Sequence, residues 1–170
     1  MTNIVDDFYA KYNELLDLIP SKDLSLKNWA HENFRRVLVL TMANYLENEI
    51  TNLLKEFSRT KSGNEFLYSF MKNKAIERQY YTFFEWKGHN ANQFFSLFGE
   101  DFRKQASSEV DSNDVLNEAV KAFLEIGKTR NILIHESLHV VDIGNKTAKE
   151  FYDLFNKSLN FIAFLRTKFA

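Results

Sequence analysis

The sequence contains no cysteine, so disulfide bonds and thiol chemistry are excluded, as is common in a reducing compartment. It has a single proline and five glycines, so few positions interrupt a helix. No apolar run approaches the roughly 20 residues that a membrane span requires. The N-terminal region carries Asp6 and Asp7 and lacks the basic-then-apolar pattern of a signal peptide. We therefore expect long helices, no membrane segment and a cytoplasmic protein.

Net charge is also nearly absent, at −1 from 22 basic and 23 acidic residues. This balance excludes a uniformly basic coat for nucleic acid, but it allows a local basic patch. Aromatic residues are abundant instead, with 17 Phe, 7 Tyr and 2 Trp in a chain that is 45% hydrophobic. A length of 170 residues suffices to bury a substantial core. Because no repeat or linker divides the chain, we expect a single domain over residues 1–170.

Apolar residues recur at helical spacing in four long segments. The expected helices cover residues 3–19, from the N-cap Ser25 to about Ser58, from near Ser112 into the 130s, and residues 146–168. Residues 59–110 are less regular and hold shorter helical pieces around an aromatic-rich stretch. The pattern predicts an all-α fold, namely an antiparallel helical bundle with a partly irregular insertion in the middle.

Arg130 interrupts the apolar line of the third long helix. Leu116, Phe123 and Arg130 are spaced seven apart, so a guanidinium stands where an apolar side chain is expected. An unpaired buried guanidinium is costly, so we expect Arg130 to have an acidic partner or to face a cleft or an interface. The alternative is an arginine at the helix edge whose charged end reaches solvent.

Arg130 is followed by Asn131 and by His135. Asn131 and His135 are four apart and share a helix face, so the amide can orient the imidazole. Arg130 and His135 lie about 140° apart on a regular helix, so two copies of the helix would bring them to one phosphate most easily. Histidine suits proton transfer near neutral pH, and arginine matches phosphate oxygens. This chemistry suits RNA cleavage by the 2′-hydroxyl, which requires no metal and no cofactor.

The sequence Arg130-Asn131-x3-His135, late in an all-helical chain, resembles the motif of HEPN ribonucleases. Two further stretches are similar to this family and its RiboL-PSP branch: Tyr45-Leu46-Glu47-x-x-Ile50, and Trp86 followed by Asn90-Ala91-Asn92-Gln93-Phe94-Phe95-x-Leu97-Phe98-Gly99. Together with the motif, the resemblance extends from about residue 30 to 165. The resemblance implies a homodimer in which two motifs face one composite RNA-cleaving cleft. It also implies that Arg130 and His135 are catalytic and that Asn131 and Glu47 support them.

The same resemblance implies an RNA substrate and a role as a toxin or phage-defence effector, because the RiboL-PSP branch occurs in bacterial conflict systems. An antitoxin or a nucleotidyltransferase would then be a partner. The alternative is a non-catalytic HEPN module that binds a nucleotidyltransferase or mediates dimerisation. Between Lys55 and Arg78, six basic and three acidic residues are interleaved with aromatics, a composition that suits RNA binding.

The sequence His135-Glu136-x-x-His139 matches a second motif, the zinc site of metallopeptidases. Two histidines four apart on a helix can bind zinc, with the glutamate as base for a bound water. Asp142 or Glu150 would have to supply a third ligand. No familiar downstream signature follows, and the strands of a peptidase sheet are not predicted. We therefore treat the peptidase as a remote alternative and expect no metal.

Overall fold

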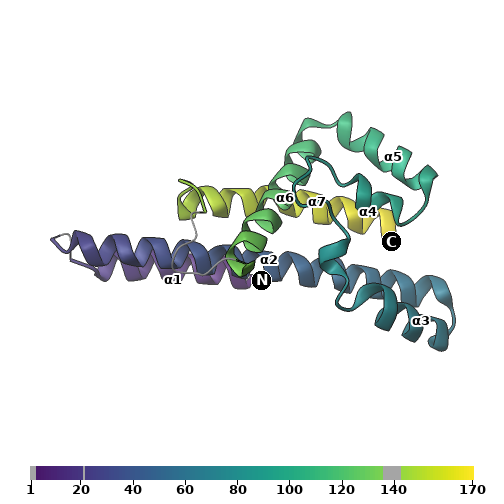
Figure 1. Cartoon of the computed structure of the whole chain (residues 1–170), viewed down its shortest axis with the longest axis horizontal. Coiled ribbons are helices and arrows are strands. Elements are labelled where there is room, and N and C mark those ends of the chain that lie inside the picture. The colour runs from purple at the N-terminus through teal and green to yellow at the C-terminus, as the bar shows by residue number, and fades with distance from the viewer. Residues whose placement is uncertain (1–2, 21, 136–142) are drawn as a thin grey trace.

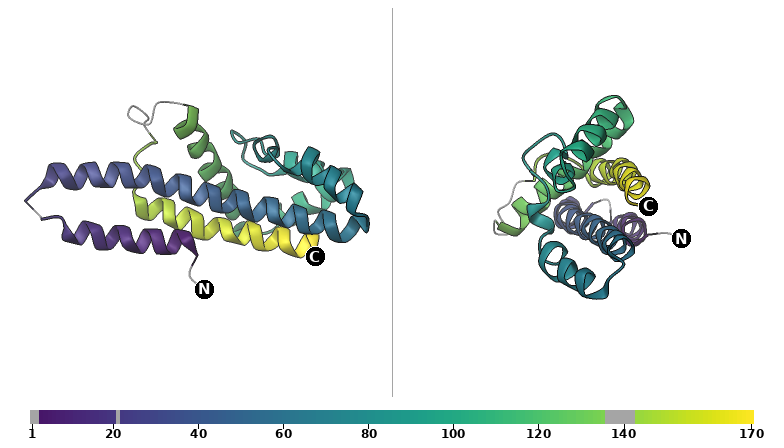
Figure 2. Two further views of the ribbon diagram at one scale, coloured as in Figure 1. Left: turned by 90° about the horizontal axis from the view of Figure 1, so that it is seen from below. Right: turned by 90° about the vertical axis from the view of Figure 1, so that its right-hand side faces the viewer.

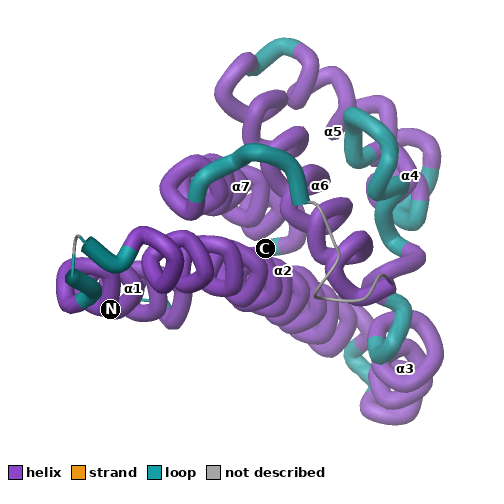
Figure 3. The backbone as a smooth tube through the Cα atoms, turned by 60° about the vertical axis from the view of Figure 1, so that its left-hand side comes forward, coloured by secondary structure: helices purple, strands orange, loops and turns teal. Residues whose placement is uncertain are grey.

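The structure is a computed structural model that describes residues 3–20, 22–135 and 143–170. Every regular element in these ranges is helical (Figures 1 and 3). The elements are α1 (Ile4–Leu18), α2 (Leu24–Ser62), α3 (Glu65–Met71), a π-helical segment (Lys72–Ile76), a 3-10 turn (Tyr80–Thr82), α4 (Asn92–Ser96), α5 (Glu100–Asp111), α6 (Asp114–His135) and α7 (Ala148–Phe169). The prediction of an all-α fold is confirmed.

The long helix α2 is the element along which the others are arranged (Figure 1). α1 lies antiparallel to the first part of α2, and α7 begins beside α1 and continues along α2 (Figure 2). The contacts of Tyr45 with Phe155 and of Phe57 with Phe169 show that α7 runs in the same direction as α2. α6 crosses both helices at a steep angle (Figure 1). The expected antiparallel pairing is therefore that of α1 with α2.

The ends of α2 differ from the expected ones. Its N-cap is Asp23, whose carboxylate accepts a hydrogen bond from the backbone N–H of Leu26 at 3.1 Å, so the prediction of Ser25 as N-cap was wrong. At the other end the helix continues to Ser62. Gly63 then stops it with a φ of 58°, a left-handed conformation that glycine adopts without strain.

The middle of the chain is irregular as predicted between residues 72 and 91, but it also contains a helix that we did not predict. This helix, α5, buries Ala106 and Val110. α6 begins at Asp114 rather than near Ser112, because the side chain of Asn113 accepts a hydrogen bond from a backbone N–H of the first turn.

Aromatic side chains attach the irregular segment to α6 and α7. Phe84 stacks on Phe94 at a centroid distance of 4.8 Å, and it also contacts Phe123 of α6 at 4.8 Å. Phe123 in turn meets Phe161 of α7 at 5.1 Å. Burying one such ring stabilises the fold by about 1.5–3 kcal/mol. One continuous core thus runs from α1 to α7, and it fixes a segment that has little regular structure of its own.

No helix in the described ranges is both long enough and apolar enough to cross a bilayer.

The wide apolar face of α7 is used inside the chain, where Phe151, Phe155, Phe161 and Leu165 are fully buried. This face of α7 therefore packs in the centre of the bundle.

Candidate functional site

The Arg130 side chain extends from α6 onto the ring of Tyr81. The guanidinium carbon lies 3.8 Å from the ring centroid, well within the range of a cation–π interaction. Nη1 of Arg130 donates a hydrogen bond to Oδ1 of Asn131 at 3.2 Å. The side chain is half-buried. The arginine on the apolar line of α6 is therefore a cation held in a fixed position.

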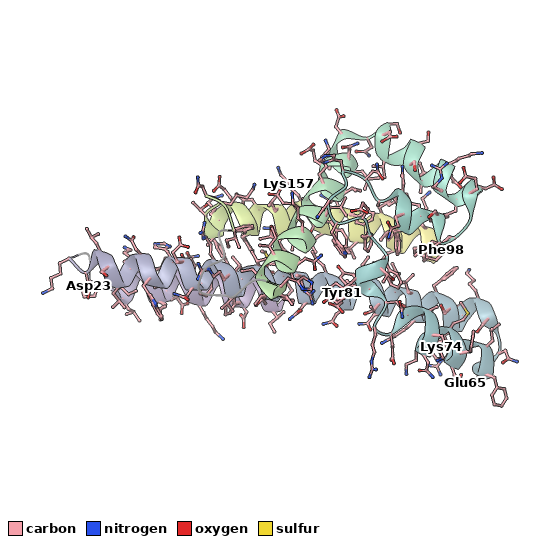
Figure 4. The ribbon with its side chains drawn as sticks, in the orientation of Figure 1. Asp23, Glu65, Lys74, Tyr81, Phe98 and Lys157 are labelled. Atoms are coloured by element: carbon pink, nitrogen blue, oxygen red, sulfur yellow. The ribbon has the colours of Figure 1, made fainter. Side chains whose placement is uncertain are left out.

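Glu47 reaches the same place from α2. The Tyr81 hydroxyl donates a hydrogen bond to Oε2 of Glu47 at 2.9 Å, and Figure 4 shows Tyr81 beside α2 near the end of α6. Glu47 and Arg130 affect each other electrostatically. Among the described residues, however, no ion pair joins them directly. Within one chain, Tyr81 therefore links Glu47 to Arg130, and Glu47 is not a direct acidic partner of the arginine.

Burial acts on both charged groups of this site. Loss of hydration raises the pKa of Glu47, and the positive charge of Arg130 opposes that rise. Burial likewise lowers the pKa of Arg130, against the effect of Glu47. Tyr80 lies beside Glu47 and Arg130. Burial raises the pKa of its hydroxyl, and the negative charge of Glu47 raises it further. Because arginine stays cationic at any physiological pH, the ionisation of Glu47 determines the net charge of the site.

Trp86 holds Tyr81 by its backbone, whereas Glu47 binds the Tyr81 hydroxyl. Its indole N–H donates a hydrogen bond to the Tyr81 carbonyl oxygen at 2.9 Å. The indole ring lies against α6 at Gly127, where an added Cβ would stand 2.0 Å from Cζ3 of the ring. Only glycine leaves room for this approach, about one helical turn before Arg130. The close packing explains a glycine inside a long helix, where it is otherwise unfavourable.

The structure brings three of the four predicted site residues together. Arg130, Asn131 and Glu47 surround Tyr81, while His135 is the last residue of α6 and has an exposed side chain. Because α6 stays helical to His135, the 140° separation of His135 from Arg130 holds. The Asn131 oxygen serves Arg130, which is not the role beside His135 that we expected.

Tyr81, which positions Arg130, was not predicted from the sequence, and neither were Trp86 and Gly127. The available signal was Gly127, since an isolated glycine in a helical pattern often marks a close packing contact.

The basic and aromatic stretch of residues 55–78 lies elsewhere, along the last turns of α2, on α3 and on the π-helical segment. Figure 4 labels Glu65 and Lys74 in this part of the molecule, beyond Tyr81 along α2.

The zinc motif is only partly within the described residues, because Glu136, His139 and Asp142 lie outside them. In the described ranges, no three His, Cys, Asp or Glu side chains are grouped so that they could hold a metal ion. The carboxylate of Glu150 accepts hydrogen bonds from the backbone N–H and the hydroxyl of Thr147, at 2.7 and 2.8 Å. Glu150 therefore caps the start of α7.

Comparison with protein families gives a match over most of the chain. A family model described as RiboL-PSP-HEPN matches residues 6–170, which is nearly the whole chain. Searches of curated proteins and of solved structures each returned no match.

The packing of Trp86 on α6 predicts that Gly127→Ala destabilises the protein. Helix propensity alone predicts the opposite, a gain of about 0.5–1 kcal/mol. The new Cβ would displace the indole ring, and such overpacking costs about 1–3 kcal/mol. Urea unfolding should therefore show a lower midpoint for the variant. In a Trp86→Leu background, the same substitution should be neutral or stabilising. A gain in the wild-type background would contradict the packing.

The raised pKa of Glu47 predicts how stability depends on pH. Well below pH 4 both the folded and the unfolded chain hold the proton, so folding does not bury a charge there. As pH rises through the raised pKa, the folded protein must carry a poorly hydrated charge at Glu47. The protonated carboxyl therefore favours folding at low pH, and this contribution to the free energy of unfolding is lost as pH rises. Glu47→Gln should thus unfold at a higher temperature than wild type at pH 7, and this advantage should vanish on acidification.

The matched control for this measurement is Glu118→Gln on α6. The Lys121 ammonium, which donates a hydrogen bond to Glu118, lowers the pKa of that exposed carboxyl. Its contribution is present at neutral pH and is lost as pH falls, so the control should show a small effect of opposite sign. If Glu47→Gln followed the same direction as Glu118→Gln, the Glu47 carboxylate would be a stabilising group.

Proposed function

The chain belongs to the RiboL-PSP-HEPN family, and on that premise we propose that it is a metal-independent endoribonuclease in which Arg130 and His135 cleave RNA. The observation that carries this proposal is the state of Arg130. Its guanidinium is held by the Tyr81 ring and the Asn131 oxygen, and no carboxylate among the described residues forms an ion pair with it. A fixed cation with free donors suits the oxygens of a phosphate.

In the proposed reaction, the ribose 2′-oxygen attacks the adjacent phosphorus as the bond from phosphorus to the 5′-oxygen breaks. The products are a 2′,3′-cyclic phosphate and a 5′-hydroxyl. A base must remove the proton of the 2′-hydroxyl, and an acid must give one to the leaving 5′-oxygen. His135 suits these transfers, while Arg130 stabilises the negative charge that develops on the phosphate oxygens. The protons balance without metal or cofactor.

Two copies of the chain would complete this site. One α6 helix presents Arg130 and His135 in different directions, whereas two helices related by a two-fold axis supply both groups to one cleft. Two histidines also provide a base and an acid at once. Ile134, between the two catalytic residues and half-exposed at 50%, offers apolar surface that a second copy would cover. Asn131, Tyr81 and Glu47 would hold each Arg130 in place.

The biological role that we propose is that of a toxin or phage-defence effector, held inactive by an antitoxin or a nucleotidyltransferase. The second candidate, a non-catalytic module that binds such a partner, keeps the same fold but needs no reactive arginine. The preorganised Arg130 favours the enzyme.

We expect Arg130→Ala and His135→Ala each to lower the rate of RNA cleavage by about 10²–10³, because each removes one group that stabilises the transition state. Cleavage of labelled RNA measures the rate, and circular dichroism checks that helix content is retained. The matched control is Arg103→Ala, which removes an arginine that pairs with Glu100 on α5, and it should leave the cleavage rate unchanged.

The same assay tests the alternatives. Cleavage should persist in EDTA, and His139→Ala should be mild beside His135→Ala, because only a zinc site needs both histidines. Activity that is lost to the chelator and restored by zinc would support the metallopeptidase-like site instead. If Arg130→Ala and His135→Ala both cleaved RNA as well as wild type does, the non-catalytic module would be the better interpretation.

The composite site predicts a homodimer, so light scattering should give about twice the 20.1 kDa mass of the chain. An excess of the double variant Arg130→Ala/His135→Ala, mixed with wild type, should reduce activity by more than dilution does, because mixed dimers lack the arginine and the histidine that one chain supplies to the shared cleft. The Arg103→Ala variant, added in the same excess, should cause no such loss. A fully active monomer would refute the shared cleft.

A further inference from the structure

A basic cavity lies on the face of α6 away from Arg130. It has a volume of about 460 Å³ and is formed by α6, the loop that carries Trp86 to His89, and the residues Ile143 and Gly144. Its size is typical of sites for small ligands or single nucleotides. Trp86 forms part of the wall of this cavity and also part of the wall around Arg130. The two sites are therefore separated by one side chain and one helix.

The cavity leads along α6 toward His135. Lys121, Lys128 and His135 are seven apart, so each lies within about 20° of the next around the helix, at intervals of about 10.5 Å along its axis. Lys121 and Lys128 line the cavity, and the neighbouring Leu124 and Ile132 form its apolar floor. His135 lies just beyond, on the same stripe. A strand that follows this stripe would pass from the cavity to the catalytic histidine.

The charge of the cavity is positive. Lys87, Lys128 and His89 are exposed at its rim, and among the described residues no carboxylate pairs with either of these two lysines. The one acidic residue in the wall, Glu125, is already paired with Lys146 at 2.5 Å. The nearby Glu85 carboxylate is turned toward its own loop, where it accepts a hydrogen bond from the backbone N–H of Lys87 at 3.3 Å. The rim thus has uncompensated cations in a chain with a net charge of −1.

We propose that this cavity is a subsite for single-stranded RNA, in which Lys87 and Lys128 contact the phosphates that flank the cleaved one. The proposal rests on the ribonuclease function proposed above and extends it. Phosphates give affinity through such lysines, and the apolar floor offers a surface for sugar and base faces. The subsite explains how a nearly neutral protein holds a polyanion. It also places the strand on the His135 side of α6, so that the scissile phosphate would meet Arg130 of the second copy.

The test uses the double variant Lys87→Gln/Lys128→Gln. Binding is measured in a His135→Ala background, so that the RNA stays intact, with a labelled single-stranded RNA of about 12 nucleotides. Anisotropy titrations across a series of KCl concentrations give the slope of log affinity against log salt. Each lost phosphate contact should reduce that slope by about 0.7, hence by about 1.4 for the pair. In an otherwise wild-type chain, the pair should raise KM and leave kcat nearly unchanged.

The matched control is Lys11→Gln/Lys104→Gln. It removes the same charge from exposed positions on α1 and α5, with side chains 72% and 67% exposed. This control should change neither the salt slope nor KM. Circular dichroism of both double variants checks that neither is unfolded.

The outcomes separate the subsite from the proposed ribonuclease function. If wild type cleaves RNA but the Lys87→Gln/Lys128→Gln variant binds and cleaves as the control does, the subsite is wrong and the ribonuclease function stands. If wild type cleaves nothing, yet the Lys87→Gln/Lys128→Gln variant still loses RNA affinity and salt slope, the subsite stands without the catalytic function. An equal loss in both double variants would show only general charge attraction and would overturn the subsite. Absence of RNA binding by any form would refute both proposals.

Discussion

The stacking of the Arg130 guanidinium on Tyr81 is the interaction on which the candidate site depends. Residues of three elements fix Tyr81. Glu47 of α2 accepts a hydrogen bond from the Tyr81 hydroxyl, and Trp86 donates one to the Tyr81 backbone carbonyl. Trp86 in turn packs against α6 at Gly127. Arg130 is anchored to the same helix as Gly127, so the ring and the cation are positioned by one rigid body. A small change at Gly127 would therefore reach the guanidinium through two side chains without altering any residue that contacts it.

The use of an aromatic face to hold the arginine has a chemical consequence. A direct ion pair with a half-buried carboxylate would neutralise the cation and occupy its donors, and desolvation would take back much of the energy gained. The tyrosine face stabilises the charge without neutralising it. Glu47 remains close enough to attract the cation but acts on it across Tyr81. The guanidinium consequently keeps donors for an anionic ligand, which is what phosphate recognition requires.

The sequence was sufficient to predict the features that repeat along a helix. The four long helices follow from apolar periodicity, and Arg130 was identifiable because it breaks that periodicity. α5 was missed, although its buried Ala106 and Val110 are spaced four apart, as on one helix face. Tyr81 was a different problem. Its position depends on the path of residues 72–91, which is set by ring packing of Phe84, Phe94 and Phe123 from distant parts of the chain. No local pattern encodes such a path.

The two faces of α6 carry different parts of the proposed chemistry. Arg130 faces inward, toward Tyr81, where a cation can be held rigidly but only a small part of it meets solvent. The stripe of Lys121, Lys128 and His135 faces outward, where a long polyanion can approach but where nothing in the described part of the chain preorganises a phosphate. Neither face suffices for cleavage, because binding a strand and stabilising its reacting phosphate call for opposite degrees of burial. In the proposed dimer a second copy would resolve this conflict, since it would place the inward arginine of one chain beside the outward histidine of the other.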